Sequence, residues 1–379
     1  MHAIGIICEL NPFHEGHACL IAQLRRAHPE PIALVACMSG PFVQRGTPAI
    51  LDKWTRAGIA IAQGFDLVVE LPQAYVLQAA DYFAWGGVRV LSLLPDVRSL
   101  AFGVEEVLAS TDFQALLRKK KEGSTQMQIR QSIAAGSAYR HALSQALDLP
   151  LAPNAILALA YAQAVEDQGL SWILEAYPRA GAADEDPDTK KACPSASALR
   201  RLLCQDPAAK NRLPSAHRIQ QGHFTESLQP LLAYYRLCEI LAPLDFSASP
   251  AFESGMDFRL QKALRTASSI DEAFQSAANK RQSQARYRRL FLSSLLGLSR
   301  AMTQEPVAYL RPLAFNRLGQ QLLSRASCPI VQKPTRRLLV PAQEAYFQLD
   351  ARAQALQEAL CGLEKGLDYR QSYLHREDH

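Results

Sequence analysis

The sequence predicts an α/β protein with a doubly wound parallel sheet in its first part and a mainly helical region after it. Over the first hundred residues, short apolar β-rich runs alternate with longer segments of helical periodicity. Uninterrupted apolar strands between helices are typical of a parallel sheet that is covered on both faces. After about residue 105 the strand signal fades and helical periodicity dominates. A chain of 379 residues allows two domains, which we place at residues 1–195 and 196–379.

Four apolar runs predict the strands of this sheet: Ala3–Cys8, Ile32–Met38, Leu67–Leu71 and Ser99–Phe102. The segments between them predict helices at Gly16–Ala27, Ala49–Gly64 and Ala74–Leu94. Right-handed crossovers then place helices on both faces of the sheet. In such sheets a ligand binds beyond the carboxyl ends of the strands, so the residues that follow each strand are the first candidates for a site.

Composition excludes several classes of protein. Hydrophobic residues make up 48% and charged residues 20% of the chain, which is ordinary for a globular protein and excludes a disordered one. No apolar run approaches the roughly 18 residues of a membrane span. The first residues lack the basic leader of a signal peptide, and the eight cysteines contain no C-x-x-C pair. We therefore expect a cytoplasmic protein with reduced, buried thiols. The polar, acidic segment 180–193 predicts a loop or a mobile lid.

Charge is distributed unevenly along the chain. Residues 1–200 carry 17 Lys and Arg against 20 Asp and Glu, whereas residues 201–379 carry 24 against 16. This asymmetry suggests that one part performs chemistry and the other holds a polyanion. A solvated basic face is the alternative, and it stays open at this point.

The strongest motif follows the first predicted strand, where His14-Glu-Gly-His17 opens a helix. Pro12 fixes the turn before it, and Gly16 lets a flat purine ring approach the backbone. The two histidines, three residues apart, point the same way. Unpaired N–H groups and the partial positive charge of the helix N-terminus complete an anion site for nucleotide phosphates. Catalysis there would consist of holding two reactants in line and stabilising charge at the α-phosphorus.

A zinc site is the alternative for this histidine pair. Zinc-binding helices prefer a spacing of i, i+4, and no third ligand is evident beside His14 and His17. The nucleotide interpretation is therefore favoured, and no metal ligands are assigned.

An H-x-G-H after the first strand is the signature of the nucleotidyltransferase superfamily, with its Rossmann-like fold. More narrowly, the sequence closely resembles the tRNA(Met) cytidine acetate ligase family at Gly5–His17, Ser39–Ala49, Asp52–Arg56 and Asp66–Pro72. The resemblance implies a ligase that activates acetate with ATP to acetyl-AMP. It would then acetylate N4 of the wobble cytidine of elongator tRNA(Met), forming N4-acetylcytidine. Mg²⁺ is expected as a charge partner of the ATP phosphates.

Further motifs extend this resemblance over nearly the whole chain, at Phe102–Glu105, Pro153–Leu157, Tyr177–Arg179 and Ser195–Arg200. Leu10 and Glu15 depart from it, because the family usually has Tyr and Asn at these two positions. The resemblance implies catalysis by His14 and His17. It also implies ATP binding by Ile7, Cys8, Glu9, Leu10, Asn11, Pro12, Phe13, His14, Glu15, Gly16, His17, Ala18, Cys19, Leu20, Gly103, Asn154 and Arg179.

Two further groups are candidates for binding acetate or phosphate. Arg45 and Lys53 follow the second strand and could hold the acetate carboxylate or pyrophosphate, with helix-face salt bridges as the alternative. Ser195, Ser197 and Arg200 open a helix and could clamp the β- and γ-phosphates, whereas serine also caps helices routinely.

Basic residues of the second half are the candidates for binding tRNA. We expect them along a helix, with an aromatic ring that stacks on a base: Lys280, Arg281, Arg286, Tyr287, Arg288 and Arg289. A solvated amphipathic helix is the alternative. Two rival functions also stay open. One is a nucleotidyltransferase that adenylylates a small phosphorylated metabolite without RNA, and the other is a non-catalytic protein that binds ATP and RNA.

Overall fold

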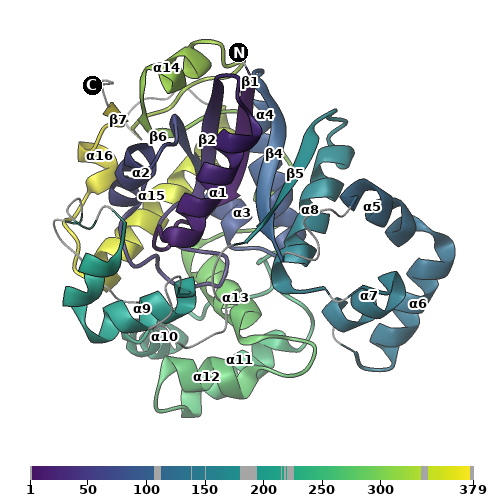
Figure 1. Cartoon of the computed structure of the whole chain (residues 1–379). Coiled ribbons are helices and arrows are strands. Elements are labelled where there is room, and N and C mark those ends of the chain that lie inside the picture. Colours follow the sequence, from purple (N-terminus) through teal and green to yellow (C-terminus); the bar gives the residue numbers. More distant parts are fainter. Residues whose placement is uncertain are drawn as a thin grey trace.

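The computed structural model describes residues 2–105, 112–137, 139–149, 151–179, 194–214, 216, 219, 226–333 and 340–375. The acidic segment expected to form a loop or lid, residues 180–193, lies outside them. Within the described residues, seven strands form one sheet in the order β5-β4-β1-β2-β3-β6-β7 (Figure 1). β6 runs antiparallel to β3, and the other neighbouring pairs are parallel. The predicted α/β fold class is therefore confirmed.

All four predicted strands are present: β3 (Leu67–Leu71) has the predicted bounds, and the other three are slightly longer, at β1 (His2–Cys8), β2 (Ile32–Ser39) and β4 (Val97–Val104). Alternate residues serve two separate cores, because successive side chains of a strand point to opposite faces. Ile4 and Leu34 pack in the core beneath α1 (Glu15–Ala27) and α2 (Lys53–Ala62). Ala3 and Val35 pack in the larger core on the other face.

Two predicted helices have different bounds from those expected. α2 begins at Lys53 because Asp52 caps it, with Oδ1 accepting from the Thr55 N–H at 2.9 Å. The segment expected as one helix at 74–94 is divided into α3 (Gln73–Val76) and α4 (Ala80–Ser92). The division folds α3 back onto α4, so that the Tyr75 ring fills the space where Gly86 has no side chain.

Three strands were not predicted: β5 (Ile173–Pro178), β6 (Pro312–Phe315) and β7 (Leu374–His375). β5 is an edge strand, and its first residue, Ile173, is exposed. β6 has only four residues and begins with proline. Neither β5 nor β6 therefore carries the long apolar run of a buried strand. Residues beyond 195 thus complete the sheet, while the division of the chain into domains at 195 stays a prediction.

The rest of the described chain is mainly helical, as predicted, and no helix in the described ranges is long and apolar enough to cross a membrane. In Figure 1, α5, α6 and α7 project beside β5, and α9 to α13 gather beyond the carboxyl ends of the strands. The remaining helices are α5 (Phe113–Lys121), α6 (Gly123–Ala134), α7 (Tyr139–Leu147), α8 (Pro153–Asp167), α9 (Ala196–Gln205), η2 (Pro207–Arg212), α10 (Pro230–Leu241), α11 (Met256–Thr266), α12 (Ile270–Ala277), α13 (Gln284–Leu296), η4 (Ala301–Thr303), α14 (Arg317–Ser324), α15 (Pro341–Cys361) and α16 (Leu367–Arg370).

Candidate active site

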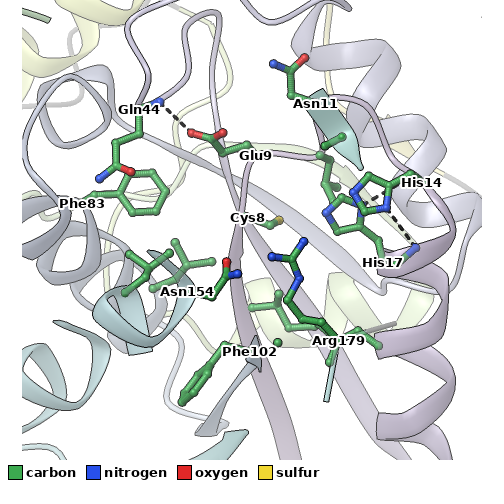
Figure 2. Close-up of a pocket in the computed structure, with 18 of the residues that line it drawn as sticks. Cys8, Glu9, Asn11, His14, His17, Gln44, Phe83, Phe102, Asn154 and Arg179 are labelled. Atoms are coloured by element: carbon green, nitrogen blue, oxygen red, sulfur yellow. Dashed lines mark hydrogen bonds between the residues drawn. The ribbon is translucent and has the colours of Figure 1, made fainter. Parts of the chain in front are cut away.

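A cavity of about 340 Å³ lies at the carboxyl ends of the central strands. The end of β1 and the first turn of α1 form one wall, the ends of β4 and β5 with the start of α8 another, and the loop after β2 with α9 a third. Figure 2 shows the side chains of Arg179 and Asn154 directed toward the same space as the His14 and His17 rings. The cavity is lined by these polar and charged residues: Glu9, Asn11, His14, His17, Gln44, Arg45, Asn154, Arg179 and Arg200.

The two histidines are fixed by a reciprocal capping arrangement at the start of α1. His14 is the N-cap, and its Nδ1 accepts from the Gly16 N–H at 3.0 Å. The Nδ1 of His17 accepts from the His14 N–H at 3.3 Å, and the two ring centroids are 4.0 Å apart. Because both Nδ1 atoms accept, each neutral ring carries its proton on Nε2. The rings are therefore held side by side as hydrogen-bond donors.

The electrostatic environment favours the neutral form of His17. Burial, the neighbouring His14 and the Arg179 guanidinium together hold the pKa of His17 well below its ordinary value. The expectation that unpaired backbone N–H groups of this turn bind phosphate is wrong for Gly16, whose N–H donates to His14, and for His17, whose N–H donates to the His14 carbonyl at 2.9 Å. Neither of these two N–H groups is available to an anion, so the imidazoles are the side-chain donors that this turn offers.

The opposite wall is built by groups that follow β4 and β5. The backbone N–H of Arg179 donates to the Val104 carbonyl at 2.8 Å, and its side chain passes over Gly103. A Cβ at Gly103 would lie 2.8 Å from Cγ of Arg179, so only glycine leaves room for this arginine. Asn154 Nδ2 donates to Glu105 Oε1 at 2.9 Å, which orients the amide. The structure brings these sequence-predicted residues into one cavity with the histidine pair.

Arg56, for which no role was predicted from the sequence, organises the ends of β1 and β2. Its buried guanidinium donates to the carbonyls of Glu9 at 2.6 Å, Ser39 at 3.0 Å and Leu51 at 3.1 Å, and also to that of Gly40. Burial lowers the pKa of Arg56 to about 10, which leaves it charged at neutral pH. Three of these carbonyls follow or end β1 and β2, and that of Leu51 precedes α2, so one cation fixes the loops that line the cavity.

The prediction that Lys53 binds acetate or pyrophosphate is wrong. Lys53 is fully buried, and its Nζ lies 2.8 Å from both Glu70 Oε1 and Asp368 Oδ1. A ligand in the cavity could not reach an amine that is enclosed by the core and neutralised by two carboxylates. Arg45, its partner in that prediction, does line the cavity.

Of the three candidates at the start of α9, Arg200 lines the cavity. Its Nη1 donates to the Asn11 carbonyl at 2.9 Å and its Nη2 to Ser197 Oγ at 3.1 Å. Ser195 is buried and caps the helix, with Oγ accepting from the Ala198 N–H at 3.1 Å. Capping therefore accounts for Ser195, and Arg200 remains the phosphate candidate of this group.

The basic run does not lie on one helix as expected. Ser283 caps α13, so Lys280 and Arg281 precede it, and both are exposed. Arg286 pairs with Glu253 and Arg288 with Asp271, each at 2.9 Å, while Arg289 Nη1 donates to the Gln44 carbonyl at 2.9 Å. The expectation that Tyr287 stacks on a base is wrong, because its ring is buried and its hydroxyl donates to Gln282 Oε1 at 2.9 Å.

Together, the parallel sheet, the cavity at its carboxyl edge and an H-x-G-H pair on the first helix define a nucleotidyltransferase. A family model described as HIGH Nucleotidyl Transferase matches residues 1–369, and the chain belongs to this class. Within it, the chain belongs to the tRNA(Met) cytidine acetate ligase family. It is 34% identical over 333 residues to the tRNA(Met) cytidine acetate ligase of Streptococcus gordonii, covering 86% of this chain and 87% of that protein.

Other relatives agree with this assignment. The tRNA(Met) cytidine acetate ligase of Streptococcus pneumoniae (strain ATCC 700669 / Spain 23F-1) is 36% identical over 333 residues, covering 85% of this chain and 86% of its own. Apo Thermotoga maritima TmcAL has the same fold, with a TM-score of 0.88 and 24% identity over 100% of both chains. The structure of T. maritima TmcAL bound with alpha-thio ATP gives a TM-score of 0.84, again with 24% identity over 100% of both chains.

Proposed function

We propose that this protein is an ATP-dependent ligase that activates acetate as acetyl-AMP and transfers the acetyl group to N4 of the wobble cytidine of elongator tRNA(Met). The observation that carries the proposal is the H-x-G-H pair, which faces a cavity lined by Asn154, Arg179 and Arg200 in a chain about 35% identical to ligases of that name. The T. maritima relative binds alpha-thio ATP, which supports ATP as the nucleotide.

The geometry supports a division of labour in the cavity. Gly103, Asn154 and Arg179 lie on the β4–β5 side, where glycine leaves room for the Arg179 side chain and the amide of Asn154 offers hydrogen bonds to a base. The His14 and His17 Nε2–H groups would donate to the α-phosphate as charge builds up on it. Arg45 and Arg200 would hold the outer phosphates or acetate. Neutral imidazoles suit this task because they donate a hydrogen bond through Nε2–H and do not take a proton from the reactants.

In the first half reaction, an acetate oxygen attacks the α-phosphorus and pyrophosphate leaves. Acetate has a pKa near that of Asp or Glu, about 4, so it is already ionised and needs no general base. Holding acetate in line with the leaving group is then the main requirement, together with stabilisation of the phosphorus oxygens.

Mg²⁺ would accompany the phosphates. Among the described residues, no group of three or more His, Cys, Asp or Glu side chains is placed to hold a metal ion. This fits an ion bound mainly through phosphate oxygens and water, as Mg²⁺ commonly is in phosphoryl-transfer enzymes. The ion would neutralise charge on the triphosphate.

Gly103 offers a test of the nucleotide side. In a Gly103→Val variant the side chain would displace Arg179, whose Cγ lies 2.8 Å from the position of the new Cβ. We expect the KM for ATP to rise by about tenfold or more, which corresponds to the loss of one charge-assisted hydrogen bond. The measurement is the rate of pyrophosphate release against ATP concentration. Gly123→Val is the matched control, because nothing lies within 4 Å of a Cβ there; an unchanged KM in Gly103→Val contradicts the assignment.

Lys280 and Arg281 are the candidates for contacting the RNA backbone, because both are exposed beside the helix that holds the Gln44 loop. We expect Lys280→Ala and Arg281→Ala each to weaken tRNA binding and to lower the slope of log affinity against log salt by about one. The measurement is a filter-binding titration at several salt concentrations. Arg98→Ala, at an exposed position near the start of β4, is the control. Salt slopes equal to that of the wild type would remove both residues from the interface.

The decisive test of the proposed function is mass spectrometry of tRNA after incubation with ATP, isotopically labelled acetate and this protein. Labelled N4-acetylcytidine at the wobble position is the expected product, accompanied by AMP and pyrophosphate. Pyrophosphate release that requires a phosphorylated small molecule but no acetate would favour the metabolite nucleotidyltransferase. Binding of ATP and tRNA without pyrophosphate release would favour the non-catalytic protein.

A further inference from the structure

Glu9 is the only Asp or Glu among the described residues that line the cavity. It follows directly after β1 and lies between the histidine turn and the loop after β2 (Figure 2). Its Oε1 accepts from the Gln44 N–H at 2.7 Å. Its Oε2 has no hydrogen-bond partner among the described residues, and the residue is partly exposed. One carboxylate oxygen is thus fixed by the backbone, and the other is left for a ligand.

A lone carboxylate is unexpected in a cavity that is proposed to receive two anions, ATP and acetate. It would repel a phosphate or an acetate that approached it, and it can accept hydrogen bonds but not donate them while it is ionised. The group that Glu9 Oε2 contacts should therefore be an N–H or O–H donor. ATP also carries donors, the ribose hydroxyls and the adenine amine, but the 4-amino group of cytidine is the one donor that has to lose a proton in the proposed reaction.

The position of Glu9 favours the acceptor side of the cavity over the nucleotide side. Gly103 and Asn154, which face the nucleotide, follow β4 and open α8. Glu9 instead accepts from the N–H of Gln44 in the loop after β2, and the carbonyl of Gln44 accepts from Arg289 of α13. Lys280 and Arg281 are exposed and come just before α13, the helix whose Arg289 contacts the Gln44 loop. Glu9 thus borders the part of the cavity wall that is connected to the proposed RNA-binding helix.

The surroundings of Glu9 keep its carboxylate basic. Burial raises the pKa of Glu9, and this effect exceeds the opposing influence of the Gln44 N–H and of Arg200, Arg45 and Arg56. A carboxylate with a raised pKa accepts a proton more readily than an ordinary one, which suits a general base.

We propose that Glu9 Oε2 accepts a proton from the 4-amino group of cytidine as that amine attacks the acetyl carbon. In this step the N4 lone pair forms the N–C bond, and the bond between the acetyl carbon and the phosphate oxygen breaks. AMP leaves with the bonding electron pair. One N4 proton passes to the Glu9 carboxylate and from there to water. This catalytic role rests on the proposed function, and it concerns only the second half reaction.

The test compares the two half reactions in Glu9→Gln. The variant keeps the size of the side chain, and its amide oxygen can still accept from Gln44, but it cannot take up the proton. Acetate-dependent ATP–pyrophosphate exchange measures the first half. Single-turnover transfer from preformed acetyl-AMP to tRNA measures the second. We expect transfer to fall by about 100-fold or more, the usual contribution of a general base, and by at least about tenfold more than exchange.

Glu105→Gln is the matched control, because Glu105 orients Asn154 on the nucleotide side. Its losses should be parallel in the two half reactions. The pH profile of transfer adds a second readout: the wild-type rate should rise with pH through the ionisation of Glu9, and this rise should be absent in Glu9→Gln. Parallel losses in Glu9→Gln, or an unchanged transfer rate, overturn the role of Glu9. A wild-type protein that performs neither half reaction overturns the proposed function itself, and the role of Glu9 falls with it.

Discussion

Replacing either imidazole of the H-x-G-H pair is expected to lower acetate-dependent pyrophosphate release by at least about 100-fold while the fold stays intact. The two Nε2–H donors are held in place before any ligand binds, by hydrogen bonds on the Nδ1 side of each ring. Donors that are oriented in advance toward developing charge contribute about 10²–10³ in rate each. The side-chain amides of Asn11, Gln44 and Asn154 also line the cavity, but only the two imidazoles lie together at the first turn of α1.

The structure also indicates which substitutions remove the imidazoles without disturbing the start of α1. His14 is the N-cap of α1 and His17 is the third residue of the helix, so alanine would also remove a cap, at a cost of about 1 kcal/mol. Asparagine is a good N-cap, and glutamine at the third position can return a hydrogen bond to the cap N–H. His14→Asn and His17→Gln therefore remove the imidazoles and keep the helix start.

Pyrophosphate release and thermal unfolding should be measured together on these variants. His28→Gln is the control, because His28 ends the same helix and its Nε2 lies 2.7 Å from Glu175, away from the cavity. We expect wild-type turnover in the control and unfolding temperatures within a few degrees in all three. Turnover near the wild-type rate in His14→Asn and His17→Gln would contradict the nucleotidyltransferase assignment of this cavity.

The features that could be predicted from the sequence are determined by residues close together in the chain. β1 to β4 are short, mainly apolar segments between helical ones, and a parallel sheet is the usual arrangement that buries both of their faces. The H-x-G-H turn is likewise local, since spacing alone brings the two rings to the same side of one helical turn. The cavity follows from these two features, because the turn begins where β1 ends.

The errors concern residues whose partners are distant in sequence. Lys53 opens a helix after β2, where a phosphate-binding residue was expected, but Glu70 and Asp368 enclose it. Tyr287 lies among arginines, yet it points into the core. Sequence gives the chemistry of a side chain, but its direction depends on the elements that pack around it. Strand β6 was missed for the same reason, since its four residues are strand only because they pair with β3.

Because Lys53 is enclosed by the core, replacing it should have a second large effect, a loss in the free energy of unfolding. Lys53 and Arg311 meet the carboxylates of Glu70 and Asp368, with N···O distances of 2.8 to 3.1 Å, and all four side chains are almost completely buried. They join α2, β3, the residue before β6 and α16, so the cluster connects the first part of the chain to its end. Removing one ion of a buried pair leaves its partner uncompensated in a medium of low dielectric.

Lys53→Met is therefore expected to lower the free energy of unfolding by about 3–5 kcal/mol, which is the usual cost of an unpaired buried charge. Asp368→Asn should cost a similar amount. Although burial opposes its charged form, Lys53 and Arg311 outweigh burial and hold the pKa of Asp368 below its ordinary value. The stability that Asp368 contributes is present above its unfolded pKa, about 3.9, and is lost as the pH falls through the lower folded pKa. Urea titrations at pH 7 and at lower pH measure both effects.

Asp350 provides an internal control for this prediction, because it lies beside the cluster with the opposite shift. Burial, and then the negative charge of Glu70, raise the pKa of Asp350 well above its ordinary value, while its Oδ1 accepts from the Gln73 N–H at 2.7 Å. A group with a raised folded pKa stabilises the protein below its unfolded pKa and loses that contribution as the pH rises. Asp350→Asn imitates the protonated form, so it should be at least as stable as the wild type at pH 8, with a smaller difference near pH 4. A loss of several kcal/mol in Asp350→Asn at pH 8, equal to that in Asp368→Asn, would mean that all three carboxylates are charged and that the two cations are shared among them.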